Sequence, residues 1–134
     1  MSYATKLLDT YPYTVTVGPG LLAAAIDALN DCAQARTADA DADLSEQNLT
    51  EMVRCIRLCL DCVDVCTATV AVASRPTELD PSVTTPLLEA CAAICKSCSD
   101  ECERHAHMYQ HCRVCAEACR RCEQACRELV VAIK

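Results

Sequence analysis

From Leu21 to the end of the chain, apolar residues and cysteines recur at steps of three and four positions. This spacing is typical of one face of an α-helix. This part of the chain shows no strand pattern beside the helical one. The pattern therefore predicts an all-α protein.

Glycine, proline and two polar segments divide this pattern into four predicted helices. They are expected over about residues 20–40, 45–74, 85–105 and 108–133. Ser45 is the expected N-cap of the second helix, and Arg75-Pro76 is its expected end. The segments TADADADLS, from Thr37 to Ser45, and HAHMY, from His105 to Tyr109, are expected to form turns.

Four amphipathic helices with short connections favour an antiparallel, up-down-up-down four-helix bundle. We expect residues 18–134 to form this bundle. Residues 1–17, which include the tyrosine-rich TYPYTVTV, are expected to be an N-terminal extension.

The composition makes the predicted core unusual. Hydrophobic residues reach 52%, yet the chain has no Phe or Trp and has 14 cysteines. Such a cysteine content often marks a secreted, disulfide-bonded framework. The N-terminus, however, shows no apolar stretch long enough for a leader or a membrane span, so we expect a cytoplasmic protein with reduced thiols. A net charge of -7 disfavours nucleic acid and anionic membranes as partners.

The cysteines follow the helical spacing. They occur in CIRLCLDCVDVC on the second predicted helix, in CAAICKSCSDEC on the third, and at steps of three and four on the fourth. Steps of this kind place every thiol on the stripe that an ordinary bundle fills with Leu and Ile. The first helix adds only Cys32, and the other three add Cys55, Cys59, Cys62, Cys66, Cys91, Cys95, Cys98, Cys102, Cys112, Cys115, Cys119, Cys122 and Cys126.

Thiolates that line a core select soft metal ions, which include Cu(I), Zn and iron–sulfur clusters. A tetrathiolate zinc site carries a net charge of about -2, whereas Cu(I) and thiolate neutralise each other one for one. The bacterial iron–sulfur spacing C-x2-C-x2-C-x3-C-P does not occur here. The sequence therefore predicts multiple Cu(I) ions per chain and no catalysis, because equivalent thiols specify no single nucleophile. A Zn or iron–sulfur protein, and a helical structural protein stapled by disulfides, remain the alternatives.

The two ends of the predicted bundle differ. One end is aliphatic, with residues such as Leu88 and Leu129. At the other end the helical steps reach side chains that bind copper without having to lose a proton as a thiol must. We expect copper to enter at that end, through Met52, His105, His107, Met108 and His111. The alternative is a set of exposed histidines in a polar turn.

The chain resembles the bacterial copper storage proteins, and specifically their cytosolic branch. The most specific stretch is ECERHAHMYQHCRVCAEACRRCEQAC, from Glu101 to Cys126, within a resemblance that covers residues 18–134. The resemblance implies a homotetramer of four-helix bundles with cuprous–thiolate clusters in each core, and a copper donor or acceptor as partner. Members of the family can carry several cysteines on the first helix, so the single Cys32 implies a lower capacity here.

Overall fold

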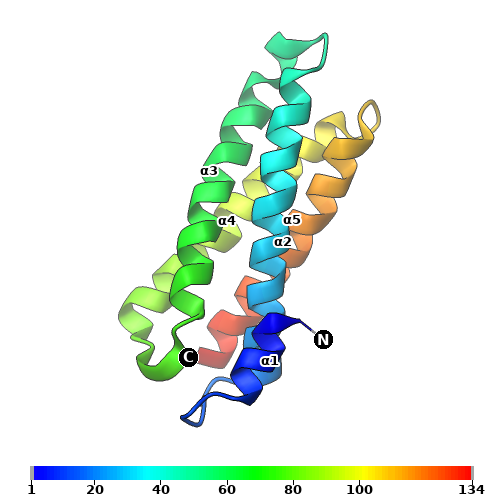
Figure 1. The fold of residues 1–134 in the computed structure, drawn as a ribbon. Helices are drawn as coiled ribbons and strands as arrows, with labels where there is room; N and C mark the ends of the chain where they lie inside the picture. Colours follow the sequence, from blue (N-terminus) through cyan, green and yellow to red (C-terminus); the bar gives the residue numbers. More distant parts are fainter. Residues whose placement is uncertain (1, 134) are drawn as a thin grey trace.

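The computed structural model describes residues 2–133, which fold almost entirely into helices (Figure 1). In chain order the elements are α1 (Tyr3–Asp9), α2 (Pro19–Leu44), α3 (Leu49–Ala73), a short 3-10 helix (Pro76–Glu78), α4 (Pro81–His105) and α5 (Gln110–Ile133). Helices α2 to α5 run alongside one another in alternating directions. Helix α2 packs against α3 and α5, and α4 packs against the same two helices. The predicted all-α four-helix bundle is confirmed.

Helix α2 continues through the segment that the sequence predicted to turn. It reaches Leu44, and Ser45 is its C-cap, with the Ser45 N–H donating to the Ala42 carbonyl over 3.0 Å. The prediction that Ser45 caps the second helix at its N-terminus is therefore wrong, because Asn48 holds that position. Alternating Ala and Asp keep helical geometry here because alanine is the best helix former. Asp39 and Asp43, one turn apart, face inward, whereas Asp41 is exposed.

Helix α4 begins at Pro81 rather than near Thr85. The Asp80 side chain accepts from the Ser82 N–H over 3.0 Å, and Pro81 occupies the first helical position, where no N–H is needed. Pro86 then lies inside the helix instead of before it. Helix α5 starts at Gln110, two positions later than predicted, because Met108 and Tyr109 both donate their N–H to the His105 carbonyl in the turn.

One end of the bundle has an aliphatic core. Leu22, Leu29, Leu88 and Leu129 are completely or almost completely buried there. Each side chain of this size contributes about 1.5–3 kcal/mol when it is removed from water. Above this aliphatic layer, cysteine replaces leucine at the inward positions of α3, α4 and α5.

The segment before the bundle packs on its aliphatic end. Helix α1 lies against α2 (Figure 1), and Ala4, Leu8, Val15 and Val17 contact the core residues. The Tyr11 hydroxyl also hydrogen-bonds the Thr77 hydroxyl over 3.1 Å. Among residues 2–133 no helix combines the length and the apolar character that crossing a bilayer requires.

Candidate metal centre in the thiol-lined core

All fourteen cysteines are buried as free thiols. They lie on the inward stripe of their helices because their steps of three and four match the helical repeat. Residues 2–133 contain no disulfide bond.

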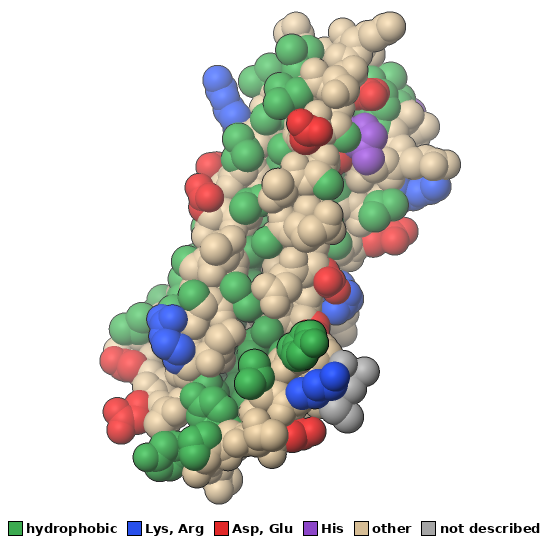
Figure 2. All heavy atoms as spheres, in the orientation of Figure 1, with side chains coloured by type: hydrophobic (Ala, Val, Ile, Leu, Met, Phe, Trp, Pro, Cys, Tyr) green, Lys and Arg blue, Asp and Glu red, His purple; other side chains and the backbone are tan. Residues whose placement is uncertain are grey.

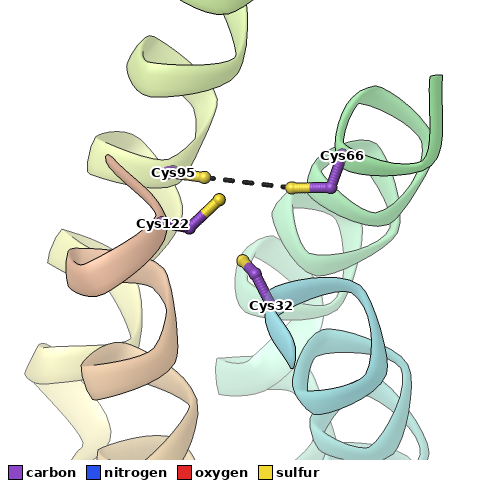
Figure 3. Close-up of side chains that lie close together, drawn as sticks. All are labelled: Cys32, Cys66, Cys95 and Cys122. Carbon is purple, nitrogen blue, oxygen red and sulfur yellow. Dashed lines mark hydrogen bonds between the residues drawn. The ribbon is translucent and has the colours of Figure 1, made fainter. Parts of the chain in front are cut away.

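Thiols from all four long helices converge at one level of the core. Figure 3 shows Cys32 of α2, Cys66 of α3, Cys95 of α4 and Cys122 of α5 pointing toward one another. Their four Sγ atoms lie within 4.8 Å of one another, and the Sγ atoms of Cys66 and Cys95 are 3.9 Å apart. Four soft ligand atoms at this spacing can surround one ion or bridge several ions.

Such groups of thiols overlap along the bundle axis. Cys32 and Cys95 also belong to a second group, with Cys62 and Cys119, and Cys122 also belongs to a third group, with Cys91 and Cys126. Sulfur–sulfur contacts continue beyond these groups, for example over 3.4 Å between Cys55 and Cys102. Because neighbouring groups share members, the core offers a continuous column of soft ligands instead of separate one-ion sites.

Neighbouring thiols shift one another's pKa in opposite directions. Hydrogen bonds with Cys112 and Cys115 lower the pKa of Cys102, whereas hydrogen bonds with Cys119 and Cys122 raise the pKa of Cys95. The thiols of this column therefore lose their protons unequally, although all are equally buried.

Helix α2 continues the same inward stripe with charged residues that the sequence did not predict as part of the core. Arg36, Asp39 and Asp43 follow Cys32 at steps of four, three and four, and all three are buried. This spacing is the one that identified the cysteines, so the signal was present. Charged side chains are usually solvated, so the spacing alone does not predict that these three residues are buried.

Arg36 reaches into the middle of the thiol column. Its Nε donates to the Sγ of Cys119 over 2.7 Å, and its Nη1 donates to the Sγ atoms of Cys102 and Cys115, each over 2.9 Å. Burial lowers the pKa of the guanidinium, but the nearby sulfurs of Cys119 and Cys115 raise it by more, so the pKa of Arg36 is raised above its ordinary value. The group is a permanent cation.

Asp39 and Asp43 lie nearer the end of the bundle, beside His111. The Asp39 carboxylate contacts His111 Nδ1 over 2.5 Å and accepts from the thiol of Cys102 over 3.5 Å. Burial raises the pKa of Asp39 to about 7 and that of Asp43 to about 6. Ligand atoms of Asp39, Asp43, His111 and Cys112 lie within 4.8 Å of one another, so oxygen and nitrogen ligands replace sulfur at this end.

The five predicted residues of the entrance occupy different environments. His111 is 30% exposed, stacks on Tyr109 with ring centroids 5.5 Å apart, and lies 3.7 Å from the Cys112 thiol. His105 is held by Glu101 through a contact of 3.0 Å to its Nε2. Met52 is buried, whereas His107 and Met108 are exposed in the turn between α4 and α5. Figure 2 shows histidine at the surface near this end of the molecule. The structure thus brings His111 and Cys112 together and leaves His107 and Met108 in the exposed turn.

A column of free thiols in shared groups defines a store for several soft metal ions rather than an active site. The copper storage protein family matches residues 20–131, and the chain belongs to this family.

Solved structures and a curated relative are similar to the chain. The copper storage protein Ccsp from Streptomyces lividans, loaded with 10 copper equivalents, has a TM-score of 0.93 and 53% identity, over 96% of this chain and 98% of that one. A cytosolic copper storage protein from Streptomyces lividans with five coppers has a TM-score of 0.82 and 56% identity, over 84% of this chain and 93% of that one. The uncharacterized cysteine-rich protein YhjQ of Bacillus subtilis (strain 168) is 34% identical over 95 residues, which are 71% of this chain and 82% of the relative.

Proposed function

We propose that the protein stores multiple Cu(I) ions on the thiolates of its core and has no catalytic role. The observation that carries this proposal is the overlap of thiol groups contributed by α2, α3, α4 and α5. A shared thiolate can bridge two cuprous ions, so a continuous column fits a polynuclear store. Membership of the copper storage protein family and the copper-loaded Streptomyces structures support the same function.

Charge favours Cu(I) over Zn in this core. A divalent ion on four thiolates leaves a net charge of about -2, and stacking several such sites in a buried column would cost several kcal/mol for each ion. Cu(I) cancels one thiolate charge per ion, and thiolate is a soft ligand that it prefers. The core can therefore fill with cuprous ions without accumulating charge.

We assign the fourteen cysteines as the ligands of the stored copper and the polar end as its entrance. Of the five entrance residues, His111 has the best position, because it is partly exposed and adjoins the Cys112 thiol. Met52 offers a buried thioether nearby, while His107 and Met108 can meet copper first in the exposed turn. His105 would act after release from Glu101 or through its other ring nitrogen.

We further propose that the protein works in the cytosol as a homotetramer and exchanges copper with a donor or acceptor. The resemblance of residues 18–134 to the family supports the tetramer, and the Streptomyces protein with five coppers is cytosolic. Side chains such as Tyr3, Leu7 and Val131 leave apolar surface exposed that a second copy could cover. Light scattering of the purified protein measures the assembly directly.

Anaerobic titration of the reduced protein with Cu(I) tests the proposed store. We expect copper uptake to approach one ion per thiol, with the count of reactive thiols falling in parallel. Saturation at about three or four Zn ions, together with weak binding of Cu(I), would contradict the proposal.

A pair of substitutions on α4 sharpens this test. Cys95→Ser removes a thiol that belongs to two groups, and we expect it to lower the saturating copper count. Ser99→Ala changes a buried side chain one turn away that bonds only the Cys95 carbonyl, so the count should stay at the parent value. An equal loss in both variants would show that the effect comes from packing and not from the thiol.

A further inference from the structure

Arg36 is a buried cation in the middle of a core that contains no other cationic side chain among residues 2–133. Its side chain is completely buried. Removing such a charge from water costs several kcal/mol, and proteins accept that cost where the charge is paired. The groups that pair with Arg36 therefore indicate its role.

The partners of Arg36 are sulfur atoms. Three N–H···S contacts of 2.7–2.9 Å join the guanidinium to Cys119, Cys102 and Cys115. The carboxylates on the same helix, Asp39 and Asp43, pair with His111 instead. Within the described residues, no ion pair joins Arg36 to a carboxylate, so the negative charge that balances it has to come from the thiols.

The guanidinium also has unused capacity. Its Nη2 is buried without any hydrogen-bond acceptor. A buried charged donor without an acceptor costs more than about 1–3 kcal/mol of free energy, and an acceptor that binds later would remove this cost. Thiolates that reorient as copper binds would supply an acceptor, and hydrogen bonds to metal-bound sulfur are a known way in which proteins stabilise charged clusters.

We propose that Arg36 is a built-in counter-cation of the copper–thiolate core and takes the place of one cuprous ion in its charge balance. This inference rests on the proposed copper store. The guanidinium stays in the core of the loaded protein and donates hydrogen bonds to the thiolates of Cys102, Cys115 and Cys119. At saturation the core then holds one more thiolate than Cu(I) ions, because Arg36 neutralises the extra thiolate.

The physical basis is the low dielectric of the core. Opposite charges a few ångströms apart interact strongly there, so the loaded core stays near neutrality. Each Cu(I) matches one thiolate, and the permanent charge of Arg36 matches one more. The guanidinium carries only donors and binds no copper, so it also keeps the ions on its two sides apart.

Copper counting by native mass spectrometry tests the proposal, with the parent compared with Arg36→Gln and Arg36→Lys after anaerobic loading with excess Cu(I). Arg36→Gln keeps hydrogen-bond donors but removes the charge, and we expect it to bind one more copper per chain than the parent. Arg36→Lys keeps the charge and should bind the parent number. Arg120→Gln makes the same change at a half-exposed surface arginine that bonds Asp100 and Glu103, and should leave the count unchanged.

The possible outcomes distinguish a failure of the proposed copper store from a failure of the proposed role of Arg36. A parent protein that takes up no Cu(I) overturns the proposed store itself. A parent that loads normally, with Arg36→Gln equal to or below it, overturns only the role of Arg36, as does Arg36→Lys behaving like Arg36→Gln.

A crystal structure of the copper-loaded parent decides the matter if Arg36→Gln fails to fold. Guanidinium nitrogens within about 3.5 Å of copper-bound sulfur would support the proposal. An Arg36 side chain turned out of the core, or paired with Asp39, would overturn it.

Discussion

The same helical spacing of inward positions continues through both ends of the bundle, but the two ends carry different types of side chain. At the end covered by α1, the inward positions hold Leu22, Leu88 and Leu129. At the end with the α2–α3 and α4–α5 turns, equivalent positions hold Asp43 and Met52, with His111 beside them (Figure 1). Burial of leucine at the first end stabilises the fold, whereas burial of carboxylates at the second end destabilises it.

This difference suggests that one end of the core provides stability and the other provides access of copper to the thiols. We expect the aliphatic layer to exclude water and ions and to hold the four helices together whether or not metal is present. In the proposed entrance, carboxylate and imidazole groups would offer an arriving cation ligands before it reaches the thiols. We therefore expect substitutions at the aliphatic end to change stability, and substitutions at the polar end to change how fast copper loads.

The largest effect should come from truncating the aliphatic layer. Leu129→Ala is expected to lower the free energy of unfolding of the apo-protein by about 2–5 kcal/mol, because it leaves a cavity in a buried position. Urea denaturation measures this change. Ile133→Ala, at a half-buried position, should cost clearly less.

Loading kinetics of the same variants test the comparison. Copper uptake from a chelated Cu(I) donor should keep the parent rate in Leu129→Ala. Faster uptake in that variant would place the entrance at the aliphatic end.

A smaller effect is expected from the buried carboxylate at the polar end. The folded-state pKa of Asp39 is about 7, above the unfolded value of about 3.9. A carboxyl with a raised pKa contributes stability that is fully present below its unfolded pKa and is lost as pH rises through its folded pKa. The free energy of unfolding of the apo-protein should therefore fall by about 1–3 kcal/mol between about pH 4 and pH 8. This decrease is smaller than the full pKa shift of Asp39 implies, because the partly exposed His111 beside it connects the site to solvent.

Asp39→Asn should flatten this pH profile, measured by urea denaturation at each pH. Asp41→Asn changes an exposed carboxyl on the same helix and should leave the profile as in the parent. A profile that stays equally steep in Asp39→Asn would assign the pH dependence to other groups.

The smallest effect in free energy should come from the histidines. His111→Ala is expected to slow loading from a chelated donor by about tenfold, equivalent to about 1.4 kcal/mol in the barrier, with the saturating copper count nearly unchanged. His107→Ala alone should slow loading less, because this side chain is exposed in the turn, and the double variant should be the slowest. Stopped-flow absorbance measures these rates. A His107→Ala/His111→Ala protein that loads as fast as the parent would remove the histidines from the path.

The thiol column could be predicted from the sequence because helical periodicity alone determines which residues share a face. The steps between Cys55, Cys59, Cys62 and Cys66 required no tertiary information to place these thiols inward. The same rule applied to α2 would have placed Arg36, Asp39 and Asp43 in the core. A charged residue is expected in water unless a partner balances its charge, and the spacing along one helix does not reveal that partner.

Local contacts decided the details that the sequence left open. The start of α4 depends on Asp80 capping Ser82, a short-range bond that competes with the helix-ending tendency of Pro86. The orientation of His105 depends on Glu101, and that of His111 on Asp39 from another helix. Glu101 and His105 lie four residues apart on α4, whereas the contact between His111 and Asp39 joins two helices. A contact between helices follows from the packed bundle and leaves no trace in the spacing of residues along one helix.

The distribution of aromatic residues gives the protein its own optical reporters. The chain has no Trp and no Phe, and none of its four tyrosines is buried. Tyr3 and Tyr11 lie beside Leu8 and Ile26 at the aliphatic end, with Tyr13 two residues further along the same segment. Tyr109 stacks on His111 at the other end. Tyrosine fluorescence in a Tyr109→Leu variant therefore reports from one end only, and its difference from the parent signal isolates the ring beside His111. The near-ultraviolet absorption of copper–thiolate bonds can be followed in the same sample without tryptophan background.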